Sequence, residues 1–129
     1  MCRADGLGAR VWADGEVARG EIALDARHAG SPHHAHGGVT AALLDEVLGT
    51  VAIIHRIAAV TGTLEIRYRA PAFLGHTYQL SARLLGIEGR RVKIVGEMTG
   101  PDGLVAEAAG TWIRVDLGHF APSPHGKGA

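Results

Sequence analysis

The sequence is poor in cysteine, in aromatic residues and in charge of one sign. Cys2 is the only cysteine among 129 residues, which excludes a disulfide within the chain. Thirteen Lys and Arg residues balance thirteen Asp and Glu residues, so the excess positive charge typical of nucleic-acid-binding proteins is missing. The longest apolar stretch, residues 39–54, is interrupted by Asp45 and Glu46, which argues against a membrane span. We therefore expect neither nucleic acid nor membrane as a partner.

The composition is that of an ordinary globular domain. Hydrophobic residues make up 47% of the chain and charged residues 20%. A chain of this length buries about two-thirds of its unfolded surface without needing disulfides. The lone cysteine suits a reducing compartment, and the first ten residues contain no apolar signal segment, so we expect a cytoplasmic protein. We predict one domain over residues 1–120 and a mobile tail, rich in Pro, Gly and Ala, over residues 121–129.

Hydrophobic periodicity changes along the chain. Residues 39–56 contain no proline and are too long for a strand, which predicts one helix. Period-two alternation predicts strands elsewhere, at residues 9–13, 17–26, 63–69, 78–84, 92–98 and 104–115. Turn signals between consecutive strands, among them residues 86–89, favour an antiparallel meander. One long helix and one antiparallel sheet predict the α+β class.

The predicted helix carries a carboxylate in an unusual setting. Asp45 is surrounded at helical spacing by small residues, namely Ala41, Ala42, Gly49 and Ala52. Small neighbours leave space beside the acid, and acids in such niches cluster at functional sites. An equally good interpretation is a polar residue at a subunit contact, satisfied by an arginine. Because the helix is apolar nearly all round, we also expect an oligomer.

A histidine and two glycines precede the helix. His36, Gly37 and Gly38 lie where backbone N–H groups have no intrahelical acceptor, so the segment could bind a developing oxyanion. The alternative is a tight turn with no further role. The neighbouring histidines at positions 28, 33 and 34 lack the spacing of a metal site, and we expect no metal.

Two segments together identify a family. The sequences HGGVTAALLDEVLG and TGTLEIRYRAPAFLG resemble the hotdog-fold acyl-CoA thioesterases, in particular the phenylacetic-acid-degradation (PaaI-like) branch. The resemblance covers roughly residues 28–115 and rests on a motif that is fairly specific. The matching residues are His36, Gly37, Gly38, Asp45, Thr61, Tyr68 and Pro71.

The resemblance implies a role for each of these residues. Asp45 would be nucleophile or general base, and the Gly37 N–H would polarise the thioester carbonyl. Thr61 would hold the attacking water, while His36 would contact the carbonyl or orient the loop. Substrate and coenzyme A contacts would come from Gly38, Tyr68, Gly89, Arg90 and Arg91. The two arginines could equally be an ordinary solvated turn.

The resemblance also implies an architecture and partners. The fold would be a hotdog: a long central helix wrapped by a curved antiparallel sheet of about five to six strands. The protein would form a homodimer or homotetramer, with HGG from one subunit and the aspartate from the other. The substrate would be an acyl-CoA or acyl-carrier thioester, with coenzyme A entering as part of the substrate and no separate cofactor. Some family members carry an asparagine six residues before the motif histidine, where this chain has Gly30.

Two other functions remain open from the sequence alone. A hotdog dehydratase or hydratase would act on the same thioesters, but its His-Phe-Pro-Gly loop is absent here. A non-catalytic acyl-CoA-binding regulatory protein is the second alternative, and the presence of Asp45 together with HGG and Thr61 argues against it. The sequence decides neither the acyl group nor the choice between nucleophilic and general-base routes.

Overall fold

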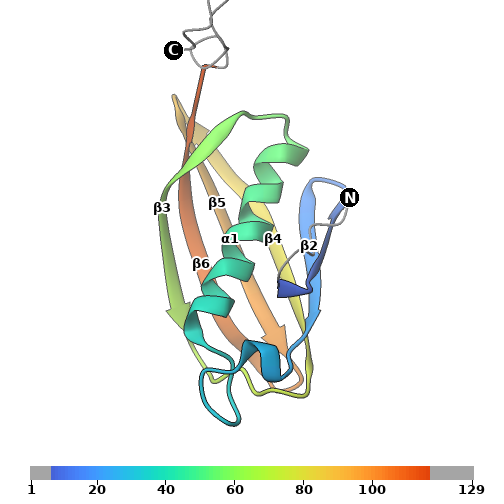
Figure 1. Cartoon of the computed structure of the whole chain (residues 1–129). Coiled ribbons are helices and arrows are strands. Elements are labelled where there is room, and N and C mark those ends of the chain that lie inside the picture. The colour runs from blue at the N-terminus through green and yellow to red at the C-terminus, as the bar shows by residue number, and fades with distance from the viewer. Residues whose placement is uncertain (1–6, 117–129) are drawn as a thin grey trace, which may run out of the picture.

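The computed structural model describes residues 7–116, which form one helix packed on one sheet (Figure 1). Cys2 and the tail at residues 121–129 lie outside the described residues. The elements are β1 (Arg10–Asp14), β2 (Val17–Ala23), the 3-10 turn η2 (Ala26–His28), α1 (Gly37–Ile54), β3 (Ala59–Tyr68), β4 (Thr77–Glu88), β5 (Arg91–Gly100) and β6 (Gly103–Arg114). All strand pairs are antiparallel, in the order β1-β2-β4-β5-β6-β3. The predicted α+β class is confirmed.

The core lies between α1 and one face of the sheet. The buried residues of the helix recur at helical spacing and are Thr40, Leu43, Leu44, Val47, Leu48, Val51 and Ala52. Each large apolar side chain buried here contributes about 1.5–3 kcal/mol relative to exposure. By length and composition alone α1 could cross a membrane, a test that the core helix of a soluble protein also passes. The sheet buries 39% of the helix in one copy, so part of its apolar surface, including Ile53, stays exposed.

The helix begins two residues earlier than predicted, at Gly37, and ends at Ile54 instead of residue 56. Glycine is a poor helix former, so the sequence pattern places the start at Val39. In the structure His36 is the N-cap, with φ −64° and ψ 136°, and its Nδ1 accepts the Gly38 N–H at 2.9 Å. This cap stabilises a first turn that glycine alone disfavours.

The predicted meander is wrong for β3 and β4. The strand β3 pairs with β6 at the edge of the sheet, while β4 lies between β2 and β5. Residues 69–76, with Pro71 and Gly75, carry the chain across one end of the sheet between them (Figure 1). Alternation indicates which face a side chain occupies, but not which strand is the neighbour. The meander holds for β4, β5 and β6.

Several strand boundaries also differ from the prediction, and β3 begins at Ala59 instead of residue 63, so it includes Thr61. The second strand ends at Ala23 instead of residue 26, because Asp25 caps the short turn η2. The strand β4 continues through Gly86, at a register shift, to Glu88, so the turn to β5 consists of Gly89 and Arg90 alone. Gly89 has a φ of 61°, which glycine adopts without strain.

Candidate active site

Asp45 and Thr61 face each other across the contact between α1 and β3. Thr61 Oγ1 lies 3.5 Å from Asp45 Oδ1 and donates to it. Hydroxyl-to-carboxylate hydrogen bonds are usually about 2.5–2.7 Å long, so these two groups are loosely joined neighbours. Asp45 is half-buried on α1, and Thr61 is exposed to solvent. A water molecule approaching the hydroxyl would therefore also meet the carboxylate.

A bulge in β3 turns Thr61 toward the helix. The pairing of β3 with β6 shifts register between Thr61 and Thr63, which leaves Gly62 as the extra residue. Bulges of this kind re-aim side chains and occur often next to active sites. A Cβ at Gly62 would lie 2.9 Å from Ile113 Cγ1 and 3.1 Å from the Thr111 carbonyl oxygen, so the bulge is closely packed.

The backbone N–H groups at the start of α1 differ in whether they have a hydrogen-bond acceptor. The Gly38 N–H donates to His36 Nδ1 at 2.9 Å, and the Val39 N–H to the His36 carbonyl oxygen at 2.9 Å. For the Gly37 N–H, no acceptor lies within hydrogen-bond distance among residues 7–116. Gly37 is exposed at the positive end of the helix dipole, where a developing negative charge is stabilised.

The His36 ring has a defined tautomer in its neutral form. Because Nδ1 accepts the Gly38 N–H, the ring proton is assigned to Nε2. The side chain is exposed. His36 thus serves as the helix cap through Nδ1, and its Nε2 carries the N–H of the ring.

Tyr68 joins the end of β3 to the start of α1. Its hydroxyl donates to the Gly37 carbonyl oxygen at 2.8 Å, while the residue is 54% exposed. A cleft of about 350 Å³ adjoins this contact and is lined by Gly37, Tyr68, Pro71 and the buried Thr40, among others. The sequence reasoning missed Thr40, although a polar residue in an apolar helix is a visible signal.

The two halves of the expected site lie apart within one chain. Gly37 and Asp45 are eight positions apart on α1, a rise of roughly 12 Å at ~1.5 Å per residue. A donor and a nucleophile acting on one carbonyl must both lie about 3 Å from it. A single copy therefore brings Asp45 to Thr61 and Gly37 to Tyr68, but does not bring these pairs together.

The arginine turn lies at the opposite end of the molecule from Gly37. Figure 1 shows the β4–β5 turn at the same end of the molecule as the C-terminus of α1. Arg90 Nε donates to the Arg114 carbonyl oxygen at 3.4 Å, and the Arg114 N–H to the Arg90 carbonyl oxygen at 2.7 Å. Arg90 and Arg91 are both exposed. Arg91 pairs with Ile113, which pairs in turn with Val60, so the turn lies at the Thr61 end of the sheet and far from Gly37.

Other ionisable groups have structural partners. Burial raises the pKa of Tyr78, whose hydroxyl donates to the Phe73 carbonyl oxygen at 2.8 Å. Hydrogen bonds from the Arg27 side chain and backbone lower the pKa of Asp25. Within residues 7–116, no group of three His, Cys, Asp or Glu side chains is placed to hold a metal ion.

The sequence is similar to a known protein family and to a characterised member of it. Residues 33–107, which include the histidine-glycine segment, Asp45 and Thr61, match the model of the thioesterase superfamily. Over 89 residues the chain is 33% identical to the acyl-coenzyme A thioesterase THEM4 of Mus musculus, covering 67% of this chain and 38% of that protein. The chain thus spans well under half the length of this curated relative.

Solved structures agree on the fold. The phenylacetic acid degradation protein PaaI of Thermus thermophilus, in a mutant form, is 25% identical with a TM-score of 0.80, over 87% of this chain and 97% of that one. A hypothetical thioesterase of Streptococcus pneumoniae, solved with coenzyme A, is 17% identical with a TM-score of 0.78, over 83% and 85% of the two chains. The long helix on a six-stranded antiparallel sheet is a hotdog fold. The chain belongs to the thioesterase superfamily, and the resemblance predicted from the sequence is confirmed.

Proposed function

We propose that the protein hydrolyses acyl-CoA thioesters to a free acid and coenzyme A. The observation that carries the proposal is the contact between Thr61 and Asp45, which sets a carboxylate beside a hydroxyl at a solvent-accessible point of a mainly apolar helix. The family match and the mouse acyl-CoA thioesterase support the same reaction class.

The reaction needs a polarised carbonyl and an activated nucleophile. In the general-base route, Asp45 takes a proton from a water held by Thr61, and the water oxygen bonds to the carbonyl carbon. The Gly37 N–H stabilises the resulting oxyanion. The carbon–sulfur bond then breaks, and the thiolate receives the proton.

In the nucleophilic route Asp45 attacks first, the thiolate leaves, and water hydrolyses the mixed anhydride. Both routes remain open and use the same residues.

The proposed enzyme is a homodimer or a larger homo-oligomer. Since Gly37 and Asp45 lie roughly 12 Å apart along one helix, we propose that Asp45 of one copy acts with Gly37 of a second. The ten-residue strand β3 supports this arrangement, because among the described strands it pairs only with β6 and its other edge is open. An isologous contact would complete two equivalent sites.

We further propose that Gly89, Arg90 and Arg91 bind phosphates of coenzyme A, with Gly38 and Tyr68 lining the path to the carbonyl. Support comes from the exposure of both guanidinium groups and from the Streptococcus pneumoniae protein solved with coenzyme A. An acyl-carrier thioester is the second substrate form that this site would accept. The reaction needs no other cofactor, and we propose a cytoplasmic location.

Thiol release from a panel of acyl-CoAs with short, long and aryl chains tests the function. Hydrolysis liberates free coenzyme A, which a thiol reagent detects. Consumption of an enoyl-CoA without thiol release would instead show a hydratase. Saturable binding with no turnover of any thioester would show a non-catalytic binding protein.

A further inference from the structure

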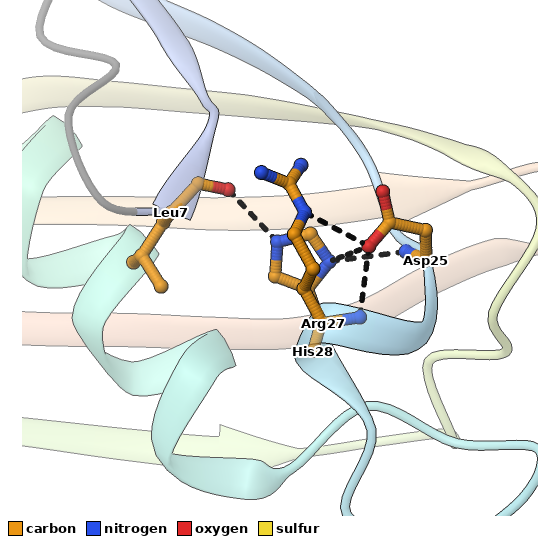
Figure 2. A network of polar contacts seen from close by, with 4 residues as sticks. All are labelled: Leu7, Asp25, Arg27 and His28. Atoms are coloured by element: carbon orange, nitrogen blue, oxygen red, sulfur yellow. Dashed lines mark hydrogen bonds and ion pairs between the residues drawn. The ribbon is translucent and has the colours of Figure 1, made fainter.

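The buried residue His28 makes hydrogen bonds to Leu7, to Asp25 and to His36, which precedes α1. His28 is 2% exposed, and both of its ring nitrogens have partners (Figure 2). The Asp25 N–H donates to His28 Nδ1 at 3.0 Å, and His28 Nε2 lies 2.8 Å from the Leu7 carbonyl oxygen. Because Nδ1 accepts a backbone N–H, the neutral ring carries its proton on Nε2 and donates to Leu7.

The same residue holds His36 through its backbone. The His36 N–H donates to the His28 carbonyl oxygen at 2.7 Å, which closes the loop of residues 28–36 at its base. The turn that carries His28 is itself braced, since Asp25 Oδ1 accepts the Arg27 N–H at 2.9 Å. The base of the loop is therefore fixed to the segment at Leu7 and to the capped turn that follows β2.

Gly30 packs directly on the backbone of His36. A Cβ at Gly30 would lie 2.7 Å from His36 Cα, closer than real Cβ atoms approach, and 3.1 Å from His36 N. The Gly30 N–H donates to the His34 carbonyl oxygen at 2.9 Å, so the loop cannot move away without losing a bond. No asparagine would fit here without displacing His36, which explains why this chain carries glycine.

The position of His36 determines where the Gly37 N–H points, because that amide belongs to the His36–Gly37 peptide. Oxyanion donors must lie within a few tenths of an ångström of their productive position to stabilise a transition state. An exposed glycine at a helix start has little packing of its own to hold it. The Tyr68 hydroxyl holds the Gly37 carbonyl oxygen, but the Gly37 N–H lies on the other side of the residue and depends on the residues that precede it.

We propose that His28 and Gly30 are positioning residues for the Gly37 amide. His28 anchors the base of the loop through its ring and carbonyl, and Gly30 allows the close approach that sets His36. The inference rests on the proposed thioester hydrolysis, in which Gly37 polarises the carbonyl. Neither residue contacts substrate, so their loss should lower kcat more than it raises KM.

The test compares two variant sets in the full-length protein. Gly30→Ala introduces the clashing methyl group, with Gly86→Ala as its control because a Cβ at Gly86 meets nothing within 4 Å. His28→Leu removes both ring bonds, while His28→Asn keeps an acceptor near the Nδ1 position. The exposed His76→Asn is the control for the histidine set. Circular dichroism and thermal melting establish that each variant is folded.

Two readouts are taken on the folded variants. We expect kcat for Gly30→Ala and His28→Leu to fall about tenfold to a hundredfold with KM changed less than about threefold, as for partial loss of an oxyanion donor. His28→Asn should recover part of that loss. In ¹H–¹⁵N spectra the Gly37 and Gly38 cross-peaks should move in Gly30→Ala and His28→Leu, and stay in place in both controls.

Unmoved Gly37 and Gly38 cross-peaks in the folded variants would overturn the positioning role, as would a kcat loss no larger than in the controls. If Gly30→Ala does not fold, the His28 pair decides the question by the same readouts. If the wild type releases no thiol from any acyl-CoA, the proposed function fails, while the cross-peaks still decide whether His28 and Gly30 set the Gly37 amide.

Discussion

The hydroxyl of Tyr68 donates to the Gly37 carbonyl oxygen at 2.8 Å, seven positions along the same strand from the contact of Thr61 with Asp45. In a regular strand, residues an odd number of positions apart face opposite sides of the sheet. The bulge at Gly62 adds one residue and brings both side chains onto the α1 side. One edge strand thus supports both halves of the candidate site.

Replacing Asp45 should abolish most turnover. Asp45→Asn removes the proposed base or nucleophile and nearly preserves its shape, so kcat should fall about 10²–10⁴-fold with little change in Tm. Glu46→Gln, one position along the same helix, is the matched control and should retain most activity. Thiol release and thermal melting measure both effects. An active Asp45→Asn with a dead Glu46→Gln would show that the wrong carboxylate has been assigned.

Filling the bulge should damage both stability and catalysis. Gly62→Ala places a methyl group 2.9 Å from Ile113 Cγ1 and against the Thr111 carbonyl oxygen, an overpacking that costs about 1–3 kcal/mol. Relief of the clash would move Thr61 relative to Asp45 and lower kcat. Denaturant unfolding gives the stability change. Wild-type stability together with wild-type kcat would show that the bulge geometry is not required.

The sequence predicts the helix and the strands of this fold better than it predicts which strands pair with one another. The apolar run of α1 and the alternation in β4, β5 and β6 follow from local periodicity, and both are present. The place of β3 beside β6 depends on which strand edge is free after folding, and periodicity carries no information on that. Strict alternation from Leu64, Ile66 and Tyr68 would put Thr61 on the outer face, and only the bulge reverses this.

The sequence motif marks a set of candidate site residues, but it does not mark the residues that hold them in place. The motif predicts that Asp45 and Thr61 act together, and the structure brings these two into contact. The sequence marks His28 only as one of several histidines, because burial and backbone contacts leave no trace in residue spacing. The capping pattern from Asp25 to His28 is the available signal, but apolar periodicity extends the preceding strand across it.

The charge of Asp25 should stabilise the fold only above acid pH. Hydrogen bonds from Arg27 lower the pKa of Asp25 below its ordinary value of 3.8, so ionised Asp25 favours the folded state above that pH. This contribution is lost as the pH falls through the lowered pKa. Asp25→Asn keeps a capping oxygen but removes the charge. Its Tm should lie below the wild-type Tm at about pH 7, and the gap should close as the pH falls below 3.8; a gap that stays constant with pH would contradict the assignment.

The arginine turn should act on binding alone. Arg90→Ala and Arg91→Ala remove contacts made equally in ground and transition states, so KM for an acyl-CoA should rise with kcat retained. Each charge-assisted contact is worth about 1.5–3 kcal/mol, which corresponds to a rise of roughly tenfold or more. Added salt should weaken the wild type more than the double variant. A short thioester without the nucleotide is the control, and unchanged KM for acyl-CoA in the double variant would mark an ordinary solvated turn.

The Gly37 N–H can be removed with little damage to the helix. Gly37→Pro places proline at the first helical position, where its missing N–H and fixed φ are tolerated. The preceding His36, at φ −64° and ψ 136°, already has the conformation that a following proline favours. We expect kcat to fall about 10²–10³-fold, as for loss of one oxyanion donor. Gly37→Ala keeps the N–H and is the control, since its Cβ would lie 3.6 Å from Tyr68 Oη.

Mixing two inactive variants tests whether the site is shared between copies. In a mixed dimer of Asp45→Asn with Gly37→Pro, one site combines an intact Gly37 from the first chain with an intact Asp45 from the second, and the other site has lost both. Because dimers assort at random, about half would be mixed and each would hold one of two sites, so activity should recover to about a quarter of the wild type. Sedimentation, with a chain mass of 13.5 kDa, checks that dimers form. Mixed dimers with no recovered activity would place Gly37 and Asp45 of the same chain in one site.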